Sequence, residues 1–390
     1  MKMERLYEQK PDIKQFDAQV ISCEGTENGT YKVILDRTAF YPEGGGQPFD
    51  TGTLGDARVI SVHEKDNYVI HETDKPFQAG ENVHGIIDWD RRFIHMQHHT
   101  GEHLFSGLVC QHYGYHNVGF HMGQEMVTID FDGILTMEQV LELEKEANEL
   151  VYCNIPVEAW YPPAEELHRL DYRSKKEISG PVRLVRIAGG DLCACCGTHV
   201  SYTGEIGTIK ITGLKKYKGG VRLEMLCGRK ALMDYEGKQE QVMKISGLLS
   251  AKQPEVAEAV EKVMKESLEK DGEIARLYQQ IFDLKCTLLP DNEDSLLVFE
   301  KDLPSVQLRK FADMLCRQQK ANLVLACSGE DGNYQYVLCT MSEDAGRLAK
   351  QLNELLRGKG NGKKIIAQGI LFASRKEIED VWSQEFWKKL

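Results

Sequence analysis

Two pairs of potential metal ligands constrain the fold of this chain more than any other feature of its sequence. His99 and His103 stand four residues apart in HTGEH, and Cys195 and His199 stand four residues apart in CCGTH. On a helix, side chains at positions i and i+4 lie on one face, about 5–6 Å apart at their Cβ atoms, so both histidines could bind one ion. Together the pairs form a His3Cys set, and four nitrogen and sulfur ligands suit zinc.

Each pair has other interpretations. Two histidines on an exposed helix are more often ordinary surface residues than metal ligands, and histidine is common in this part of the chain. A complete set of four protein ligands usually belongs to a structural zinc, because a catalytic zinc keeps one position open. Two further thiols, Cys193 and Cys196, flank Cys195 and could compete for the metal.

A glycine-rich segment, RTAFYPEGGGQPFDTG, is the third candidate for chemistry. Gly44, Gly45 and Gly46 precede Gln47, but no Lys-Ser or Lys-Thr follows them. The segment is therefore not a phosphate-binding loop of the nucleotide type. Glycines permit close approach of the backbone to a ligand, and the alternative is a plain turn between two strands.

The length of 390 residues exceeds the size at which a single hydrophobic core stops growing, so two or three domains are expected. An apolar fraction of 42% and a charged fraction of 28% are typical of a soluble globular protein and argue against disorder. We predict an α+β fold with a small N-terminal β-barrel over residues 1–90 and a zinc-containing α+β domain over 91–240. A helical linker or hairpin over 241–290 and a C-terminal α/β domain over 291–390 complete the prediction.

Hydrophobic periodicity supports this division. Alternating strands separated by turn signals fill most of the barrel region, and a helical apolar pattern over residues 91–114 places the motif histidines on a helix. Thr136 and Gln139 are spaced as a capping box before an amphipathic helix. From residue 254 to 288, apolar residues recur every three or four positions with polar interruptions near the middle, which predicts a long helix or a hairpin. We interpret residues 358–369 as a loop.

The overall charge of −12 counts against a nucleic-acid partner, because neutralising phosphates supplies much of that affinity. Local basic patches can outweigh it, and one such patch, LKKYKGGVR, contains Lys218 and Arg222. No apolar run suits a signal peptide or a membrane span, which predicts a cytoplasmic protein that contacts no membrane. In a reducing compartment, the three cysteines beside His199 indicate metal binding or reactive thiols rather than disulfides.

The three motifs, in this order, resemble the editing domain of alanyl-tRNA synthetases and its free-standing relatives, the AlaX proteins. That family has the patterns FYPxGGGQxxDxG, HxxxH and CxGTHV, which here occupy residues 40–52, 99–103 and 195–200. The resemblance extends over roughly residues 10–235. A looser one, through GKGNGK and AQG, relates the last hundred residues to the C-terminal domain that alanyl-tRNA synthetases share with DHH phosphoesterases. The chain thus resembles a long AlaX form.

This resemblance implies a hydrolase that removes wrong amino acids, chiefly serine and also glycine, from tRNA(Ala), with one zinc per chain in a positioning role. A synthetase cannot strongly exclude serine, which adds only a hydroxyl to alanine, so a second hydrolytic site is needed. The C-terminal part is expected to bind tRNA or to form a homodimer together with the helical region. The candidate site residues are the metal ligands His99, His103, Cys195 and His199, the hydroxyl-sensing Thr38 and Gln47, the substrate-contacting Gly44, Gly45 and Gly46, the general base Glu102, and the phosphate-binding Lys218 and Arg222.

Glu102 also supports a rival interpretation, since HTGEH matches the HxxEH pattern of inverted zinc peptidases, in which the glutamate activates the attacking water. Such a peptidase would need an acidic ligand well downstream, and it would leave Cys195, His199 and the glycine segment unexplained. Relatives often carry Thr or Leu at position 102, so this carboxylate is also consistent with a charge on the outer face of the helix. A non-catalytic tRNA-binding module is the second alternative.

Overall fold

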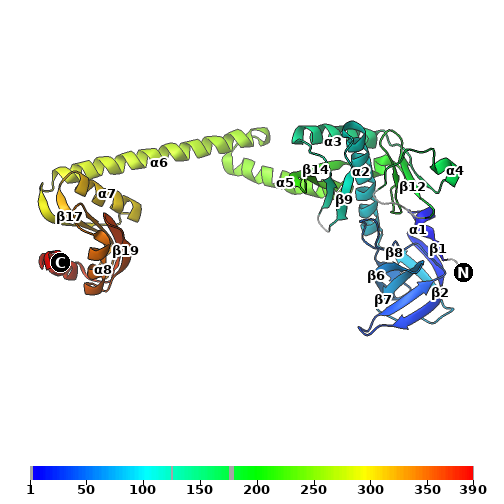
Figure 1. The fold of residues 1–390 in the computed structure, drawn as a ribbon, viewed down its shortest axis with the longest axis horizontal. Coiled ribbons are helices and arrows are strands. Elements are labelled where there is room, and N and C mark those ends of the chain that lie inside the picture. Colours follow the sequence, from blue (N-terminus) through cyan, green and yellow to red (C-terminus); the bar gives the residue numbers. More distant parts are fainter. Residues whose placement is uncertain (1–2, 124–125, 175–179, 390) are drawn as a thin grey trace. The chain divides into compact units, whose positions relative to one another are not determined.

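The structure is a computed structural model that describes residues 3–123, 126–174 and 180–389 (Figure 1). The chain divides into two compact units, Met1–Ile245 and Ser246–Leu390. Both units combine helices with sheets, which confirms the predicted α+β class. The finer division into four domains stays a prediction.

Six strands of the first unit pair in a closed barrel. In the order of pairing they are β2 (Gln15–Gly25), β3 (Tyr31–Leu35), β7 (Tyr68–Thr73), β6 (Ala57–Lys65), β5 (Gly52–Leu54) and β8 (Asn82–Ile87). Side chains alternate between the two faces of a strand, and in β2 the buried set is Phe16, Ala18 and Val20. A short parallel pair, β1 (Glu4–Arg5) and β4 (Arg37–Thr38), adjoins these strands.

One long helix, α2 (Trp89–Tyr113), follows directly from the last barrel strand (Figure 1). The Asp88 side chain caps its N-terminus by accepting a hydrogen bond from the Arg91 amide, and Gly114 ends it with a left-handed φ of 67°. Every residue from Met96 to Val109 is buried. Polar side chains in this stretch therefore need partners inside the protein.

Two sheets pack near α2. A four-stranded antiparallel sheet has the order β14 (Ile209–Tyr217), β15 (Gly220–Cys227), β10 (Val127–Phe131) and β9 (Asn117–Met122). A three-stranded sheet has the order β11 (Val157–Trp160), β12 (Leu184–Ile187) and β13 (Asp191–Ala194). The core between the first sheet and α2 also includes α3 (Met137–Tyr152), and the predicted capping box of Thr136 and Gln139 is present at its start.

The helical region consists of α5 (Gly228–Leu249) and α6 (Val256–Thr287). The sequence left open a long helix or a hairpin, and α6 continues through Gly272 without interruption, so the long helix is what forms. Its buried residues are Phe282 and Cys286. Among the residues that the structure describes, no helix is both long enough and apolar enough to cross a bilayer.

The second unit is built on a five-stranded mixed sheet between two helical layers. Its order is β16 (Glu293–Glu300), β17 (Ala321–Glu330), β18 (Asn333–Thr340), β20 (Ile366–Leu371) and β19 (Lys359–Gly362). One core contains α7 (Ser305–Arg317) and the end of α6, and the other contains α8 (Ala345–Leu355) and α9 (Arg375–Ser383).

The predicted loop over residues 358–369 was wrong. Most of these residues form the antiparallel hairpin of β19 and β20, in which Gly360 lies opposite Gly369. A Cβ at Gly360 would lie 2.5 Å from the Gln368 carbonyl oxygen, so the glycines permit close approach of the two strands. Glycine therefore marks tight strand packing in this segment, where its abundance suggested a loop.

Candidate metal centre

Four residues from two distant segments meet beside α2. The helix supplies His99 and His103, and the segment that follows β13 supplies Cys195 and His199. One ligand atom from each residue lies within 4.8 Å of the other three. The His99 and His199 ring centroids are 4.5 Å apart, and Cys195 Sγ lies 3.4 Å from His99 Nε2. The structure thus brings together all four predicted ligands, which we call the ligand cluster.

Two of the imidazoles are held through the nitrogen that faces away from the cluster. His99 Nδ1 lies 2.8 Å from Gln47 Oε1, and His103 Nδ1 lies 2.9 Å from Asp191 Oδ2. Amide and carboxylate oxygens accept hydrogen bonds, so Nδ1 carries the hydrogen in both rings and the Nε2 lone pair of the neutral ring is available to a metal. Such partners orient metal-binding rings and fix their tautomer.

The electrostatics of the ligand cluster favour a bound cation. Burial raises the pKa of the Cys195 thiol, but the His99 and His103 rings lower it well below its ordinary value. Burial lowers the pKa of His103 too, yet the adjacent Cys195 raises it well above the normal range. Burial lowers the pKa of His199 to about 3. The cluster is a thiolate among imidazoles that attracts one positive charge, supplied by a proton or by a metal ion.

The His199 ring gives the strongest evidence that the cluster could hold a metal. His199 Nδ1 lies 3.4 Å from Thr100 Oγ1, whereas His199 Nε2 is buried and has no hydrogen-bond partner among the described residues. A buried polar atom normally has a partner, because leaving it unsatisfied costs about 1–3 kcal/mol. A metal ion bound by the four ligand atoms would give Nε2 that partner.

The two competing thiols lie outside the ligand cluster. Cys193 is buried and forms a second group with His103 and Asp191 whose ligand atoms also lie within 4.8 Å of one another. This group shares His103 with the ligand cluster, and Asp191 already accepts the hydrogen of that ring. Cys196 is exposed. Cys195 is thus the thiol that the fold presents to all three histidines.

Two glycines leave room for the ligand cluster. A Cβ added to Gly197 would lie 2.1 Å from His99 Cε1, so a larger residue in this position of CCGTH would displace that ring. Gly46 has a φ of 86°, and a Cβ there would lie 2.6 Å from Cδ1 of Phe120. The Phe120 ring stacks on His99 with centroids 5.3 Å apart. The glycine segment therefore packs against the residue that forms one wall of the cluster.

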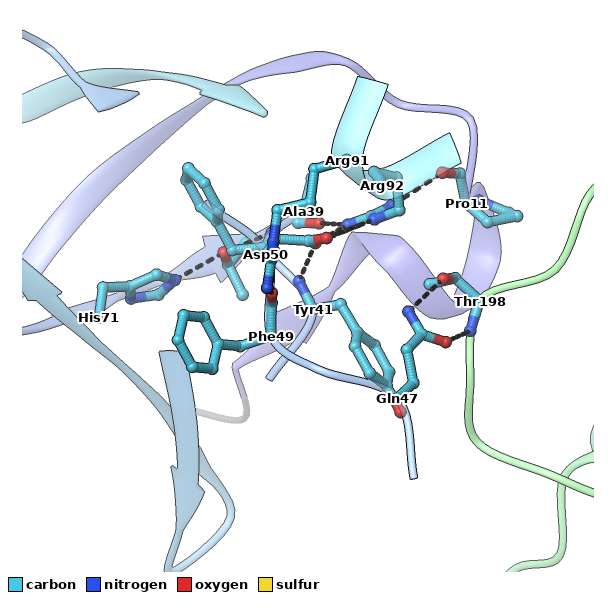
Figure 2. A network of polar contacts seen from close by, with 12 residues as sticks. Pro11, Ala39, Tyr41, Gln47, Phe49, Asp50, His71, Arg91, Arg92 and Thr198 are labelled. Carbon is cyan, nitrogen blue, oxygen red and sulfur yellow. Dashed lines mark hydrogen bonds and ion pairs between the residues drawn. The ribbon is translucent and has the colours of Figure 1, made fainter. Parts of the chain in front are cut away.

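Gln47 ties the glycine turn to the loop that carries the cysteine ligand. Gly44 and Gln47 close the turn through two backbone hydrogen bonds of 3.1 and 2.9 Å, and Gly45 between them is exposed. Gln47 Nε2 donates to Thr198 Oγ1 at 2.7 Å, and the Thr198 amide donates to Gln47 Oε1 at 3.2 Å (Figure 2). Because Oε1 also accepts from His99, this one side chain joins all three sequence motifs.

A buried ion pair fixes α2 to the segment that contains the glycine turn. Arg92 and Asp50 are both fully buried, and Arg92 also donates to the carbonyl oxygens of Pro11 and Ala39 at 2.9 and 2.5 Å (Figure 2). The Tyr41 amide donates to Asp50 at 2.6 Å. Removing one member would leave the other charge buried without a counter-ion. The aspartate of GGGQPFD is thus a structural anchor.

Sequence reasoning missed the residues that hold the ligands in place. Arg183 donates to the carbonyl oxygens of Cys195 and Gly197, each at 3.0 Å. Arg173 donates two hydrogen bonds of 2.7 and 2.8 Å to Asp191. The sequence gives no local signal for these roles, because each depends on a contact with a residue more than ten positions away.

Thr38, the predicted sensor of the substrate hydroxyl, lies in β4 and is fully buried. Its Oγ1 accepts from the Phe40 amide at 3.1 Å and lies 2.8 Å from His71 Nε2. Burial lowers the pKa of His71 to about 4, and its Nδ1 lies 3.1 Å from the Val33 carbonyl oxygen. The neutral His71 ring therefore has its hydrogen on Nδ1, so Thr38 donates to Nε2 and keeps one lone pair to accept a further hydrogen bond.

Glu102, the predicted general base, is buried on α2. Its Oε1 accepts from the Ser106 hydroxyl at 2.7 Å and from the Asn117 side-chain amide. The carboxylate is therefore anchored within the core of the first unit, so it is not a charge on the outer face of the helix.

Of the predicted phosphate contacts, Lys218 lies in the turn between β14 and β15, and Arg222 lies in β15. Arg222 makes two hydrogen bonds of 2.6 and 2.7 Å to Asp130, and its guanidinium lies 3.8 Å from the Tyr217 ring centroid. Lys218 Nζ lies 5.1 Å from the same ring. Asp130 alternates along β10 with the buried Ile129 and Phe131, so its partner Arg222 lies on the face of the sheet away from the core.

Two family profiles match parts of the chain. The profile of the threonyl and alanyl tRNA synthetase second additional domain matches residues 182–224, which contain the cysteine loop. The profile of class II (A) tRNA synthetases matches residues 4–91, which contain the glycine turn. Among solved structures, the C-Ala domain of Aquifex aeolicus alanyl-tRNA synthetase is 20% identical, covering 24% of this chain and 92% of that chain, with a TM-score of 0.22.

Similar proteins match most of the chain. The alanyl-tRNA editing protein AlaX-L of Pyrococcus horikoshii is 29% identical over 407 residues, which cover 97% of both chains. The alanyl-tRNA editing protein Aarsd1 of Danio rerio is 29% identical and covers 96% of both. The alanine–tRNA ligase of Pyrococcus abyssi is 30% identical across 93% of this chain, which spans only 41% of the ligase. By its motifs and by relatives that match almost its whole length, the chain is similar to the AlaX family of alanyl-tRNA editing proteins.

Proposed function

We propose that this chain is a trans-editing deacylase that hydrolyses the ester between tRNA(Ala) and a wrong amino acid, chiefly serine and also glycine. One observation carries the proposal: the three motifs of the editing family converge on the ligand cluster, where Gln47 bonds both His99 and Thr198. Relatives that match almost the whole chain are named alanyl-tRNA editing proteins, which supports tRNA(Ala) as the partner.

The metal in this proposal is one zinc ion per chain. One thiolate and three imidazoles fit its preference for four nitrogen and sulfur ligands. When bound there, zinc would polarise the ester carbonyl or orient the aminoacyl group. The protein's part is to keep the ligands aligned, which Gln47 and Asp191 do through His99 and His103.

Discrimination between serine and alanine falls to Thr38. Its hydroxyl has one lone pair left after its bonds with His71 and the Phe40 amide, so it would accept the hydrogen of a serine hydroxyl. Alanine has no such hydrogen, and a site built around a substrate hydroxyl disfavours an analogue that lacks it. The backbone of Gly44, Gly45 and Gly46 would contact the substrate closely.

Positioning of the tRNA is proposed for Lys218 and Arg222, which would contact phosphate without reading sequence. Lys218 would contribute a point charge, whereas Arg222 would have to share its guanidinium between phosphate and Asp130. The salt dependence of tRNA binding measures this directly. Replacing Lys218 with Ala should reduce the slope of log affinity against log salt by about one.

The rival zinc peptidase and the non-catalytic binding module make different predictions for Glu102. The test incubates the parent protein and a Glu102→Gln variant with seryl-tRNA(Ala) and with a mixture of peptides. Deacylation by the parent without peptide cleavage supports editing, and residual deacylation by the variant supports a site that does not depend on one base. Peptide cleavage that the variant loses, with no deacylation by the parent, would establish the peptidase. Binding of tRNA without either reaction would establish the binding module.

The cytoplasm is the proposed location, in keeping with a tRNA substrate. A homodimer is the proposed assembly, because the apolar residues of α6 follow a repeat of alternating three and four positions and remain largely exposed. The apolar members of the repeat are Val256, Val260, Val263, Ile274, Leu277, Ile281, Leu284 and Leu288, and Ser267 and Lys270 interrupt it. A second copy of the same helix is the occupant that matches its length and its pattern.

A further inference from the structure

Thr100 lies on α2 between the two histidines of HTGEH, and its side chain is fully buried. Its hydroxyl donates to the Met96 carbonyl oxygen at 2.8 Å, about one helical turn earlier. The same hydroxyl oxygen accepts from the Val200 amide at 3.1 Å, and it lies 3.4 Å from His199 Nδ1. One hydroxyl on α2 therefore contacts both the ring of His199 and the backbone of the residue that follows it.

The bonding capacity of this hydroxyl decides which group is the donor between Thr100 and His199. A threonine hydroxyl has one hydrogen to donate and two lone pairs that accept. The Met96 carbonyl takes the hydrogen, and the Val200 amide takes one lone pair. The second lone pair is left for His199, so Nδ1 carries the hydrogen of this contact. A neutral imidazole has only one such hydrogen, which leaves Nε2 as the nitrogen with a lone pair.

This tautomer agrees with the surroundings of the other ring nitrogen. His199 Nε2 is buried without a hydrogen-bond partner in the part of the chain that the structure describes, and its ring belongs to the ligand cluster. His99 and His103 also donate from Nδ1, each to an oxygen outside the ligand cluster. Metal-binding histidines generally donate their other ring hydrogen to such a partner, which fixes the tautomer and the orientation of the ring. The Thr100 hydroxyl completes this pattern for the third ring.

We propose that Thr100 is the positioning residue of His199, and that it holds Nε2 toward the metal through the hydrogen bond at Nδ1. This inference rests on the zinc site of the proposed function and is independent of which amino acid is removed from the tRNA. Thr100 acts on the metal only through the His199 ring and through the Val200 amide, which ties the end of CCGTHV to α2. Its loss should therefore weaken metal binding more than the loss of a buried hydroxyl elsewhere in the same unit.

The test compares two buried threonines that hold different partners. Thr203 is also fully buried, and its hydroxyl donates to the Leu150 carbonyl oxygen and accepts from the Ile155 amide, both at 2.8 Å. Neither partner belongs to the ligand cluster. Valine has nearly the size of threonine but no hydroxyl, so Thr100→Val and Thr203→Val each leave buried backbone partners unpaired. Thr100→Ser keeps the hydroxyl and is the conservative variant.

Zinc affinity is measured by competition with a chromophoric chelator, and the visible absorption of bound cobalt(II) reports the geometry of the ligands. Thr100→Val should bind zinc about 10- to 100-fold more weakly than the parent and should shift the cobalt bands, because the His199 ring is no longer held. Thr203→Val should match the parent in both measurements, although its melting temperature also falls. Thr100→Ser should recover the zinc affinity of the parent.

Nitrogen-15 NMR of the zinc-loaded parent tests the tautomer without any substitution. The ring hydrogen of His199 should be on Nδ1, and Nε2 should have the chemical shift of a metal-bound nitrogen. Metal binding through His199 Nδ1 would overturn the inference. This measurement decides the question even if Thr100→Val does not fold.

The inference is also overturned if Thr100→Val keeps the zinc affinity of the parent, or if Thr203→Val weakens it as much as Thr100→Val does. Hydrolysis of seryl-tRNA(Ala) by the parent is measured separately. Hydrolysis by the parent, with unchanged zinc affinity in Thr100→Val, rejects the positioning role and leaves the proposed function standing. Weaker zinc binding in Thr100→Val alone, without hydrolysis by the parent, rejects the proposed function and leaves the positioning role in place.

Discussion

The ligand cluster and helix α6 differ in how far their side chains are buried. In the cluster, His99, His103 and His199 are buried, and contacts from within the same unit orient them. In α6, Phe282 and Cys286 are buried, whereas apolar side chains such as Leu284, which is 67% exposed, face solvent. Contacts within one unit thus suffice to position the ligands, whereas the exposed face of α6 would be covered only by a further surface.

The largest expected effect is on the cluster. The double variant His103→Ala, Cys195→Ala should lose the zinc, about one ion per parent chain, and with it all deacylation, because two of four ligands are gone. Elemental analysis of the purified proteins measures this, and Cys196→Ala is the control, since that thiol is exposed and lies outside the cluster. Full metal retention by the double variant would refute the ligand assignment. Loss of zinc from Cys196→Ala would assign the thiolate ligand to Cys196.

The second effect concerns the exposed apolar repeat of α6. Replacing Ile281 or Leu284 with Asp would place a charge in the repeat of α6 and should convert a dimer into a monomer, as measured by light scattering. Lys265→Asp is the control, because that side chain is 79% exposed and lies outside the repeat. A parent that is already monomeric would contradict the dimer, and α6 would then need a different partner.

The third effect concerns the anchor between α2 and the barrel. Arg92→Leu leaves Asp50 buried without its counter-ion and should lower the free energy of unfolding by about 3–5 kcal/mol. Arg186→Leu breaks an ion pair with Glu158 in which both side chains are about half exposed, and it should cost at most about 1 kcal/mol. Urea unfolding compares the two. Equal losses in the free energy of unfolding would mean that burial does not determine how much each ion pair contributes to stability.

The fourth effect is on specificity. Thr38→Val removes the hydroxyl that would accept from serine and should reduce the serine over alanine preference by about 1–3 kcal/mol in kcat/KM. The same variant removes a hydrogen bond to His71, so its melting temperature is measured alongside. An unchanged preference for serine over alanine in a folded variant would show that Thr38 contributes only to the structure of the barrel.

The smallest effect is on pH dependence. Burial lowers the pKa of His71 from its ordinary value of 6.5 to about 4, so the contribution of the neutral ring to stability is fully present above about pH 6.5 and is lost as the pH falls toward 4. The parent should therefore lose about 1–2 kcal/mol more than His71→Leu between pH 7 and 5. Denaturant unfolding at both values gives the difference. If the parent and His71→Leu lost the same free energy of unfolding between pH 7 and 5, the assignment of His71 as a buried neutral ring would be contradicted.

Local features of the fold were predictable, and long-range contacts were not. The capping box before α3 follows from neighbouring residues, and the spacing of His99 and His103 alone places both on one helical face. Asp191 lies 88 residues from His103 in the sequence, so the residues near either one do not predict their hydrogen bond. The role of Gln47 in sensing substrate stays a prediction, and its hydrogen bonds with His99 and Thr198 were not predictable from neighbouring residues.

The central claim is that the cluster at α2 serves an editing reaction on tRNA(Ala). The most direct measurement supplies purified protein with an equimolar mixture of seryl-tRNA(Ala) and alanyl-tRNA(Ala) and follows both esters in the same reaction. The account predicts rapid loss of the seryl ester while the alanyl ester persists at its spontaneous rate. Equal hydrolysis of both esters, or loss of neither above the spontaneous rate, would contradict it.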